Sequence, residues 1–307
     1  MKIFLLGSIA FDEIGQFKGH FREVIKPEMM EKLTVSFLVE NNHSHFGGCS
    51  GNTAYGLGVL KTTAYLCSRI GTDGASYEKA FLDWGMNLDF LERGQGPTAK
   101  AVVTTDLTGA QIAHFATGVI GENAPDFVLP GAAEAGDFIL TGPENPKRML
   151  QALEQGYARG LQVFFDPGQL IHTFSAGDLQ STLGKIHALL VNEYEWALFQ
   201  SISGIGEAEI FQKVPLVWIT KGAEGVAMIE NGKSQNFPAF TAQVADPTGA
   251  GDAFRAGLLA GIAKGMSLED STKAGIVLAA ACCEHHLAQG YSLKDPQVAV
   301  LRTLGFD

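Results

Sequence analysis

Residues 137–165, DFILTGPENPKRMLQALEQGYARGLQVFF, set the architecture of this chain. Asp137–Leu140 and Gln162–Phe165 are short apolar runs typical of buried strands, and Pro146–Ala158 between them is a predicted helix. A strand, a helix and a second strand in this order predict a βαβ unit, in which the two strands lie parallel in one sheet.

The same alternation extends on both sides of this unit. Further strands are predicted at Lys2–Leu6, near Thr63–Ile70, at His187–Val191 and at Leu216–Thr220. Further helices are predicted at Asn52–Leu60, near Ala75–Trp84 and at Glu193–Phe199. No internal repeat or linker interrupts the pattern. We therefore expect one α/β domain over residues 1–307, with a doubly wound, mostly parallel sheet flanked by helices.

Two β-rich segments, roughly residues 11–46 and 96–117, depart from the alternation. Thr34–Val39 in the first is strand-like, and Ala99–Thr105 and Gln111–Phe115 in the second are a predicted hairpin. We expect the two segments to form a small β-sheet lid. In open α/β sheets ligands bind at the carboxyl ends of the strands, and a lid over that edge would exclude water.

Composition narrows the class of protein. Hydrophobic residues make up 46% and charged residues 18% of the 307 residues, which is typical of a soluble globular chain. The formal charge of −11 argues against binding a nucleic-acid backbone. The start has no cationic leader, no apolar run is long enough for a membrane helix, and the four cysteines form no CxxC pair. We expect a cytoplasmic protein with neither nucleic acid nor membrane as partner.

The strongest local signal is residues 246–254, DPTGAGDAF. Gly249, Ala250 and Gly251 precede an apolar helix predicted at Ala253–Ala263, so bare N–H groups and the positive end of the helix dipole form an anion hole. Asp252 lies beside that hole, where it can accept the proton of a nucleophilic hydroxyl during phosphoryl transfer. The simpler interpretation is an aspartate that caps a helix after a glycine turn.

A second glycine-rich turn, Gly47-Gly48-Cys49-Ser50-Gly51-Asn52, also precedes a helix. Gly47 and Gly48 permit close approach of a ligand to the backbone, and Asn52 offers a donor and an acceptor. An ordinary loop with a helix cap would carry the same residues.

Two further turns follow apolar strands. Asn192 and Glu195 are three residues apart at a helix start, where they could position Mg²⁺-bound water near phosphates or simply begin the helix. Thr220, Gly222 and Gly225 belong to a glycine-punctuated turn that suits a nucleotide. Lys233 and Ser234 resemble the end of a P-loop, but the leading glycine is absent, and no GxGxxG follows the first strand.

With these elements in order, the chain resembles the ribokinase-like (PfkB) family of sugar and nucleoside kinases along nearly its whole length. The resemblance implies that Asp252 is the catalytic base and that Gly249, Ala250 and Gly251 form the anion hole. It also implies that Asp12, Gly47, Gly48 and Asn52 contact the hydroxyls of a sugar or ribose.

For the nucleotide, the resemblance matches Asn192 and Glu195 to the family's NxxE motif, which is tied to Mg²⁺ and phosphate. It places Thr220, Gly222 and Gly225 beside ATP. Asp246 and Thr248 match positions near a monovalent cation, which implies possible K⁺ dependence. Some family members dimerise through the strands of the lid, so both a monomer and a homodimer are compatible with the sequence.

Residues 37–55, 104–106 and 111–115 resemble the bacterial adenosine-kinase branch of the family. This resemblance narrows the range of possible acceptor molecules to nucleosides such as adenosine. Phe37 and Phe115 would stack on a purine, with Gln111 nearby; alternatively both aromatic rings are lid core. Ala110 and Arg255 depart from the branch pattern, and Arg255 either adds a cation near the phosphates or faces solvent.

The resulting expectation is ATP-dependent phosphorylation of the 5′-hydroxyl of adenosine or a related nucleoside. A free-sugar kinase of the ribokinase or fructokinase type is the alternative within the family. A catalytically silent protein that binds a nucleoside or a sugar is the alternative outside the enzymes.

Overall fold

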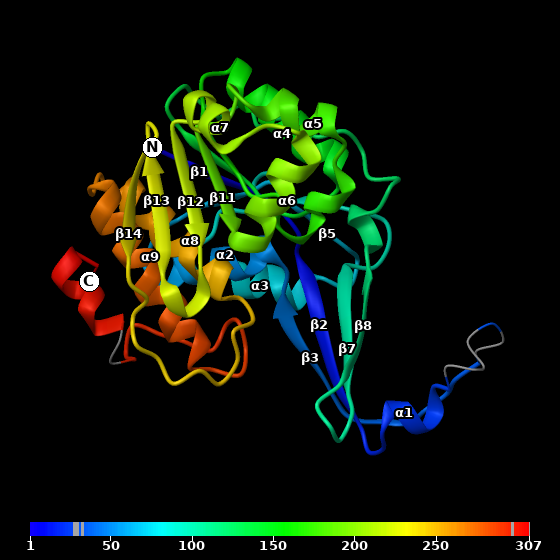
Figure 1. Ribbon diagram of the computed structural model, residues 1–307. Coiled ribbons are helices and arrows are strands. Elements are labelled where there is room, and N and C mark those ends of the chain that lie inside the picture. The colour runs from blue at the N-terminus through cyan, green and yellow to red at the C-terminus, as the bar shows by residue number, and fades with distance from the viewer. Residues whose placement is uncertain (27–30, 32–33, 296–297, 307) are drawn as a thin grey trace.

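The computed structural model describes residues 1–26, 31, 34–295 and 298–306. Its main body is built on an eight-stranded sheet of order β14-β13-β12-β11-β10-β9-β1-β4. A separate four-stranded sheet of order β3-β2-β7-β8 extends away from the main body, as Figure 1 shows. The predicted fold class, a doubly wound and mostly parallel α/β sheet with a small β-sheet lid, is confirmed.

The large sheet is parallel except at one edge. Its strands are β1 (Ile3–Leu6), β4 (Tyr65–Leu66), β9 (Phe138–Thr141), β10 (Gln162–Phe165), β11 (Ala188–Asn192), β12 (Leu216–Thr220), β13 (Val226–Glu230) and β14 (Lys233–Phe237). The last two are antiparallel and joined at Asn231 and Gly232, which both have positive φ, as a tight hairpin requires. The strand predicted near Thr63–Ile70 is in fact two, because β5 (Arg69–Ile70) leaves the sheet to pair with β6 (Glu92–Arg93).

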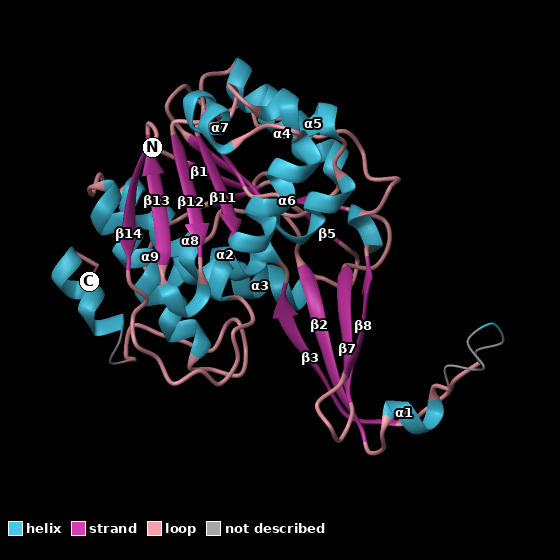
Figure 2. Cartoon of the chain, viewed as in Figure 1, coloured by secondary structure: helices cyan, strands magenta, loops and turns pink. Residues whose placement is uncertain are grey.

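Helices cover both faces of this sheet (Figure 2). One layer contains α2 (Cys49–Val59), α3 (Ala75–Asp83), α8 (Ala250–Ala263) and α9 (Leu268–Cys283). The other contains α4 (Pro146–Ala158), α5 (Ala176–Thr182), α6 (Glu193–Ser203) and α7 (Glu207–Lys213). Short helices are α1 (Phe21–Val24) and the 3₁₀ segments η2 (Gly118–Ile120), η3 (Gly168–Thr173), η4 (Gly222–Glu224) and η5 (Val298–Leu304).

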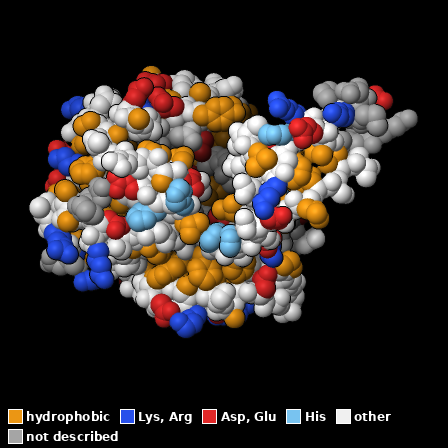
Figure 3. All heavy atoms as spheres, turned by 90° about the horizontal axis from the view of Figure 1, so that it is seen from below, with side chains coloured by type: hydrophobic (Ala, Val, Ile, Leu, Met, Phe, Trp, Pro, Cys, Tyr) orange, Lys and Arg blue, Asp and Glu red, His pale blue; other side chains and the backbone are white. Residues whose placement is uncertain are grey.

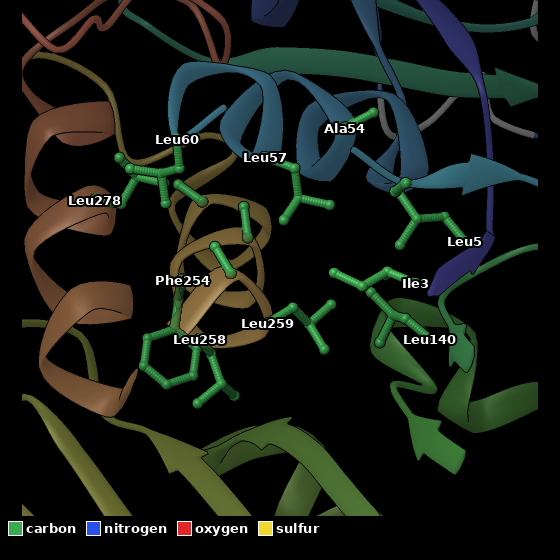
Figure 4. Packing of buried hydrophobic residues seen from close by; sticks show 14 of the residues in the cluster. Ile3, Leu5, Ala54, Leu57, Leu60, Leu140, Phe254, Leu258, Leu259 and Leu278 are labelled. Carbon is green, nitrogen blue, oxygen red and sulfur yellow. The ribbon is translucent and has the colours of Figure 1, made fainter. Parts of the chain in front are cut away.

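The pleat of the strands divides the apolar side chains between two cores. Leu5 and Leu140 contact the layer of α2 and α8, as Figure 4 shows, whereas Leu6 and Ile139 contact the opposite layer. Successive side chains of a strand point to opposite faces, so a parallel sheet covered on both faces needs apolar residues at every position. This requirement explains why β1 is wholly buried.

The lid consists of β2 (Ala10–Phe17), β3 (Val39–Gly47), β7 (Ala99–Thr105) and β8 (Gln111–Ala116), of which β7 and β8 form the predicted hairpin. The strand predicted at Thr34–Val39 is wrong, because only Val39 is in a strand. Residues 27–30 and 32–33 of the first excursion lie outside the described residues. Within the described ranges, none of the helices has both the length and the apolar content needed to cross a membrane.

Candidate active site

The candidate site lies at the carboxyl edge of the large sheet, beside the start of α2 and of α8. The side chains of Asp166 and Asn192 stand directly after β10 and at the end of β11, respectively. Asn52 on α2 contacts Asp252 on α8, and Asp166 contacts Arg255 on α8. Segments that are far apart in the chain therefore meet at one edge, as expected for an open α/β sheet.

Asp252 is the third residue of α8 and does not cap it, because the N-cap is Gly249, at φ 81°. Its carboxylate instead turns toward α2, where Oδ2 accepts a hydrogen bond of 2.9 Å from Nδ2 of Asn52. The residue is 8% exposed. Burial raises the pKa of Asp252, and Arg255 opposes that rise. The helix-capping interpretation is therefore wrong for Asp252, and a base of raised pKa suits proton transfer near neutral pH.

The predicted anion hole is the first turn of α8, which begins at Ala250 rather than at Ala253. The amide of Ala253 makes the first intrahelical bond, to the carbonyl of Gly249 at 2.9 Å. The amide of Ala250 already donates to the carbonyl of Pro247 at 3.1 Å. Within the described part of the chain the amides of Gly249, Gly251 and Asp252 have no backbone acceptor. These N–H groups are therefore the ones available to an anion.

The second glycine turn brings Asp12 over the start of α2. Gly48 is the N-cap of α2 at φ 83°, and a Cβ there would lie 2.6 Å from the carbonyl oxygen of Ser8. A Cβ on Gly47 would lie 2.2 Å from Oδ2 of Asp12. Burial, and then the charge of Asp252, raise the pKa of Asp12 to about 6. The structure thus groups Asp12, Gly47 and Gly48 with Asp252 and Asn52.

A buried polar network fixes the amide of Asn52. Gln289 donates through Nε2 to Oδ1 of Asn52 at 2.9 Å and to the hydroxyl of Tyr77 at 3.0 Å. Tyr77 in turn donates to the carbonyl of Gly47 at 2.9 Å. Because Oδ1 of Asn52 accepts from Gln289, its Nδ2 is the atom that faces Asp252. The network orients the Asn52 donor toward the candidate base.

Asn192 and Glu195 form a capping box at the start of α6. Oδ1 of Asn192 accepts from the amide of Glu195, and Oε2 of Glu195 accepts from the amide of Asn192, both at 2.8 Å. The simpler interpretation, a helix start, therefore describes their hydrogen bonds. Glu195 is also 8% exposed and its charge acts on Asp252 and Asp166. One of its carboxylate oxygens is used by the cap, and the other is not needed there.

A cavity of about 460 Å³ adjoins the anion hole. Thr220, Gly222 and Gly225 line one side of it, and Ala250 and Gly251 line another. Its remaining walls are largely apolar and include Val226, Phe240, Ile276 and Ala280. An apolar slot that ends at bare helix amides suits a base and ribose followed by phosphates.

Asp246 and Thr248, the residues suggested for a monovalent cation, do not form a defined cation site in the structure. Oδ1 of Asp246 accepts from the amide of Thr248 at 2.9 Å, an ordinary turn on an exposed loop. The Sγ of Cys282 lies 3.4 Å from the carbonyl of Thr248. Across the described residues there is no group of three metal-ligating side chains. This arrangement is compatible with Mg²⁺, which is commonly held by substrate phosphates and few protein ligands.

Three of the predicted acceptor-binding residues, Asp12, Phe115 and Gln111, lie on one face of the lid. Asp12 pairs in register with Ala101 on β7, and Ala101 pairs with Phe115 on β8, so Asp12 and Phe115 project from one face of the lid. Phe115 is 44% exposed. Gln111, the first residue of β8, lies on the same face, and its side chain donates a hydrogen bond to the hydroxyl of Thr105. Seen from below, a hollow separates the lid from the main body (Figure 3).

Phe37 is not brought to this face of the lid near Asp12. Its ring packs against Phe17 at 4.9 Å and Phe21 at 5.3 Å, between ring centroids. Phe17 ends β2, whereas Asp12 lies near its start, so the cluster stands at the outer end of the lid. The expectation that Phe37 stacks on a purine is therefore wrong for this arrangement, and the alternative of lid core describes its contacts.

Three residues of this region escaped the sequence analysis as site residues. Asp166 directly follows the buried strand β10, the same signal that singled out Asn192, and its side chain is 1% exposed. For Arg255 the sequence leaves two alternatives open, a cation near the phosphates or a solvent-facing side chain, and does not mark it as a site residue. Gln289 lies in an irregular segment after α9, where no periodicity or motif marks it.

Comparisons with known proteins show what the whole chain is similar to. A nucleoside kinase from Methanocaldococcus jannaschii is 28% identical over 265 residues, which cover 84% of each chain. A fructokinase from Escherichia coli is 26% identical over 260 residues, covering 77% of this chain and 83% of the fructokinase.

The chain is also similar to solved structures of nucleoside kinases. The ligand-free nucleoside kinase of Burkholderia thailandensis superposes with a TM-score of 0.83 at 31% identity, covering 97% of this chain and 99% of the other. The same kinase in complex with inosine has a TM-score of 0.83 at 29% identity, covering 98% of each chain. The model of the pfkB family of carbohydrate kinases matches residues 20–295. The chain therefore belongs to the pfkB carbohydrate kinase family, whose members are ATP-dependent phosphotransferases.

Proposed function

We propose that the protein transfers the γ-phosphoryl group of ATP to the 5′-hydroxyl of a purine nucleoside, adenosine or a related one. The observation that carries the proposal is the contact of Asn52 with Asp252 beside the bare amides of α8. It joins a candidate base, a group able to bind a hydroxyl and an anion hole in one place. The nucleoside kinases among the relatives support the choice of acceptor.

The proposed step uses Asp252 as general base. Its carboxylate takes the proton of the acceptor hydroxyl as that oxygen forms a bond to the γ-phosphorus. The bond between the γ-phosphorus and the bridging oxygen breaks, and ADP leaves with the electron pair. The amides of Gly251 and Asp252 hold the phosphoryl oxygens during transfer, as donors aimed at developing charge do.

The acceptor is held from the lid and from α2. Asp12 and Asn52 would bind the ribose hydroxyls, with Gly47 and Gly48 allowing close approach to the backbone. Ala101 lies between Asp12 and Phe115 in the cross-strand row, and its single methyl group leaves space above the sheet for a ring. A base lying there would stack on Phe115 while its ribose reached Asp12.

The nucleotide would occupy the cavity lined by Thr220, Gly222 and Gly225, with its phosphates at the anion hole. Bound Mg²⁺ would neutralise phosphate charge, held by the phosphates and, through water, by Glu195. The residues fit a cation held mainly by phosphates: no three carboxylates of the described residues converge on one metal position, but Asp166, Glu195 and Asp252 place negative charge that a cation bound with ATP would offset. Asp246 and Thr248 are proposed as the outer edge of a K⁺ site.

The test is ADP release from Mg-ATP and K⁺ with adenosine, inosine, guanosine, cytidine, ribose and fructose as separate acceptors. We expect a purine nucleoside to give the highest kcat/KM. Dominance of ribose or fructose would favour the free-sugar kinase, which the fructokinase relative also represents. Absence of turnover with every acceptor would favour the silent binding protein.

A further inference from the structure

The side chain of Arg255 lies over the start of α8, one turn after Asp252. A Cβ built on Gly251 would lie 2.6 Å from Nη1 of Arg255, so the guanidinium covers the backbone of the anion hole. Nη1 is also 3.8 Å from Oδ1 of Asp252. The side chain is 13% exposed. Arg255 therefore lies inside the candidate site and does not face solvent.

Asp166 holds this guanidinium from the opposite side. Its Oδ2 is 2.5 Å from Nε of Arg255, and the carboxylate is 1% exposed. Asp166 comes directly after β10, so its position is fixed by the central sheet. Asp166 pairs with the Nε side of the guanidinium, and among the described residues no side chain or carbonyl accepts a hydrogen bond from either Nη atom. Both terminal nitrogens remain available to a ligand.

The charges of the site indicate which ligand these nitrogens suit. Arg255 is surrounded by Asp166, Asp252 and Glu195, whose charges favour its cationic form. A guanidinium presents paired N–H donors that match the oxygens of a phosphoryl group. During transfer, negative charge is spread over the three peripheral oxygens of that group, and a cation at this place stabilises it.

We propose that Arg255 contacts the phosphoryl group in transfer, as a catalytic residue, and that Asp166 is the positioning residue that keeps its guanidinium over the anion hole. The proposal rests on the proposed kinase function. Arg255 adds hydrogen bonds to the step described above and changes neither its bonds nor the fate of its proton. The competing account is an ion pair that merely ties α8 to β10.

The variants are Arg255→Lys, Arg255→Gln, Asp166→Asn and the double variant Asp166→Asn/Arg255→Gln. Arg255→Gln leaves the buried carboxylate of Asp166 without its cation, whereas the double variant removes both charges of that pair. The double variant therefore keeps the test usable if Arg255→Gln fails to fold. Arg302→Gln, an exposed arginine on η5, is the matched control. Each protein is compared by thermal unfolding, by kcat and KM with the best acceptor, and by calorimetric affinity for ADP and for the non-hydrolysable β,γ-imido analogue of ATP.

We expect Arg255→Gln and the double variant to lose on the order of 10²-fold to 10³-fold in kcat, as when a donor to a developing oxyanion is removed. They should also lose roughly tenfold or more in affinity for the imido analogue while keeping that for ADP. Arg255→Lys should recover part of kcat, and Asp166→Asn should lower kcat with Arg255 still present.

A folded double variant with wild-type kcat and wild-type affinity for the imido analogue would overturn the proposal. A wild-type protein without turnover would refute the kinase function instead. In that case the selective loss of affinity for the γ-phosphate analogue still supports the contact, and equal loss for both nucleotides refutes it.

Discussion

Nδ2 of Asn52 lies 2.9 Å from Oδ2 of Asp252 and donates a hydrogen bond to it across 200 positions of the chain. The contact joins the start of α2 to the start of α8, the two helices whose glycine turns stood out in the sequence. It places a neutral donor on the carboxylate that we assign as the base. The donor favours the charged form of Asp252 against the burial that disfavours it.

Asp252→Asn should lower kcat on the order of 10²-fold to 10⁴-fold, because the amide cannot accept the hydroxyl proton. Nucleotide affinity should survive, since the anion-hole amides belong to the backbone. The measurement is steady-state ADP release together with calorimetric titration of ATP. Asp83→Asn on the exposed end of α3 is the control. Turnover within threefold of wild type would remove Asp252 from its assigned role.

Gln289→Leu should raise the KM of the acceptor roughly tenfold with a smaller change in kcat. The substitution leaves Oδ1 of Asn52 and the hydroxyl of Tyr77 without their donor, and an unmet buried polar group costs about 1–3 kcal/mol. The exposed Gln95→Leu is the control. If acceptor KM stays constant while only the melting temperature falls, Gln289 supports the fold and does not orient Asn52.

Gly249→Ala should abolish most activity, whereas Gly265→Ala should not. Both glycines have positive φ, 81° and 76°, so either alanine costs about 1–2 kcal/mol of backbone strain. Only at Gly249 does the new Cβ meet a neighbour, the Cβ of Ala288 at 2.4 Å. The turn must then shift, and a displaced anion hole costs on the order of 10²-fold in kcat. Equal kcat values in two folded variants would contradict this explanation.

Asp12 should make acceptor binding depend on pH. Its folded pKa of about 6 lies above the ordinary value of 3.8, so ionisation of Asp12 weakens folding progressively between about pH 4 and pH 6. Asp12→Asn should therefore be more stable than wild type above pH 6 and equally stable below pH 4, by thermal unfolding. The acceptor KM of wild type should rise as pH falls through 6, because the carboxylate is the better hydroxyl acceptor.

The Asp12→Asn variant should have a higher acceptor KM, by roughly tenfold, that stays level from pH 5 to pH 8. A pH profile of KM shared by both proteins would assign the titration to another group. The control is the KM for ATP, which should not change with the ionisation of Asp12 in the wild type and should be the same in the variant.

Phe115 and Phe37 form a matched pair of lid aromatics with opposite expectations. Phe115→Ala should raise the KM for a purine nucleoside roughly tenfold, because one stacking contact with the base is lost. It should leave the KM for ribose unchanged, because ribose has no base to stack. Phe37→Ala should leave both KM values alone and lower the unfolding free energy by about 1 kcal/mol, through loss of packing on Phe17 and Phe21. If Phe115→Ala affects ribose and nucleoside equally, Phe115 does not stack on the base.

The main architecture and the position of the candidate base at a helix start could be predicted because their signals are local. The βαβ alternation fixes a parallel sheet, and both glycine turns lie at helix starts that such a sheet brings to one edge. The contact between Asn52 and Asp252 could not be read directly, since each residue is only one of several near its turn. The contact of Gln289 with Asn52 could not be predicted from the sequence, because it depends on the tertiary packing of an irregular segment.

Other errors have physical causes of their own. The strand-like pattern at Phe37 misleads because an apolar residue that packs in a small aromatic cluster with Phe17 and Phe21 looks the same in the sequence as one in a strand. The sequence predicts a start of α8 at Ala253 rather than Ala250, because glycine and alanine carry little periodic signal. Of the three residues predicted as the anion hole, Gly249 and Gly251 have free amides and Ala250 does not, and Asp252 adds one.

The place of β1 between β9 and β4, one strand from the edge of the large sheet, has a consequence for biosynthesis. Ile3 on β1 pairs with Phe138 on β9, so one edge of this apolar strand stays open until nearly half of the chain has left the ribosome. An open strand edge invites association with other chains. The contact of Asn52 with Asp252 also forms late, because Asp252 is synthesised after the last strand of the large sheet, which ends at Phe237. The strands of the sheet are therefore complete before the candidate active site can form. Slow translation between residues 6 and 138 would therefore reduce the yield of folded protein more than slow translation after residue 220.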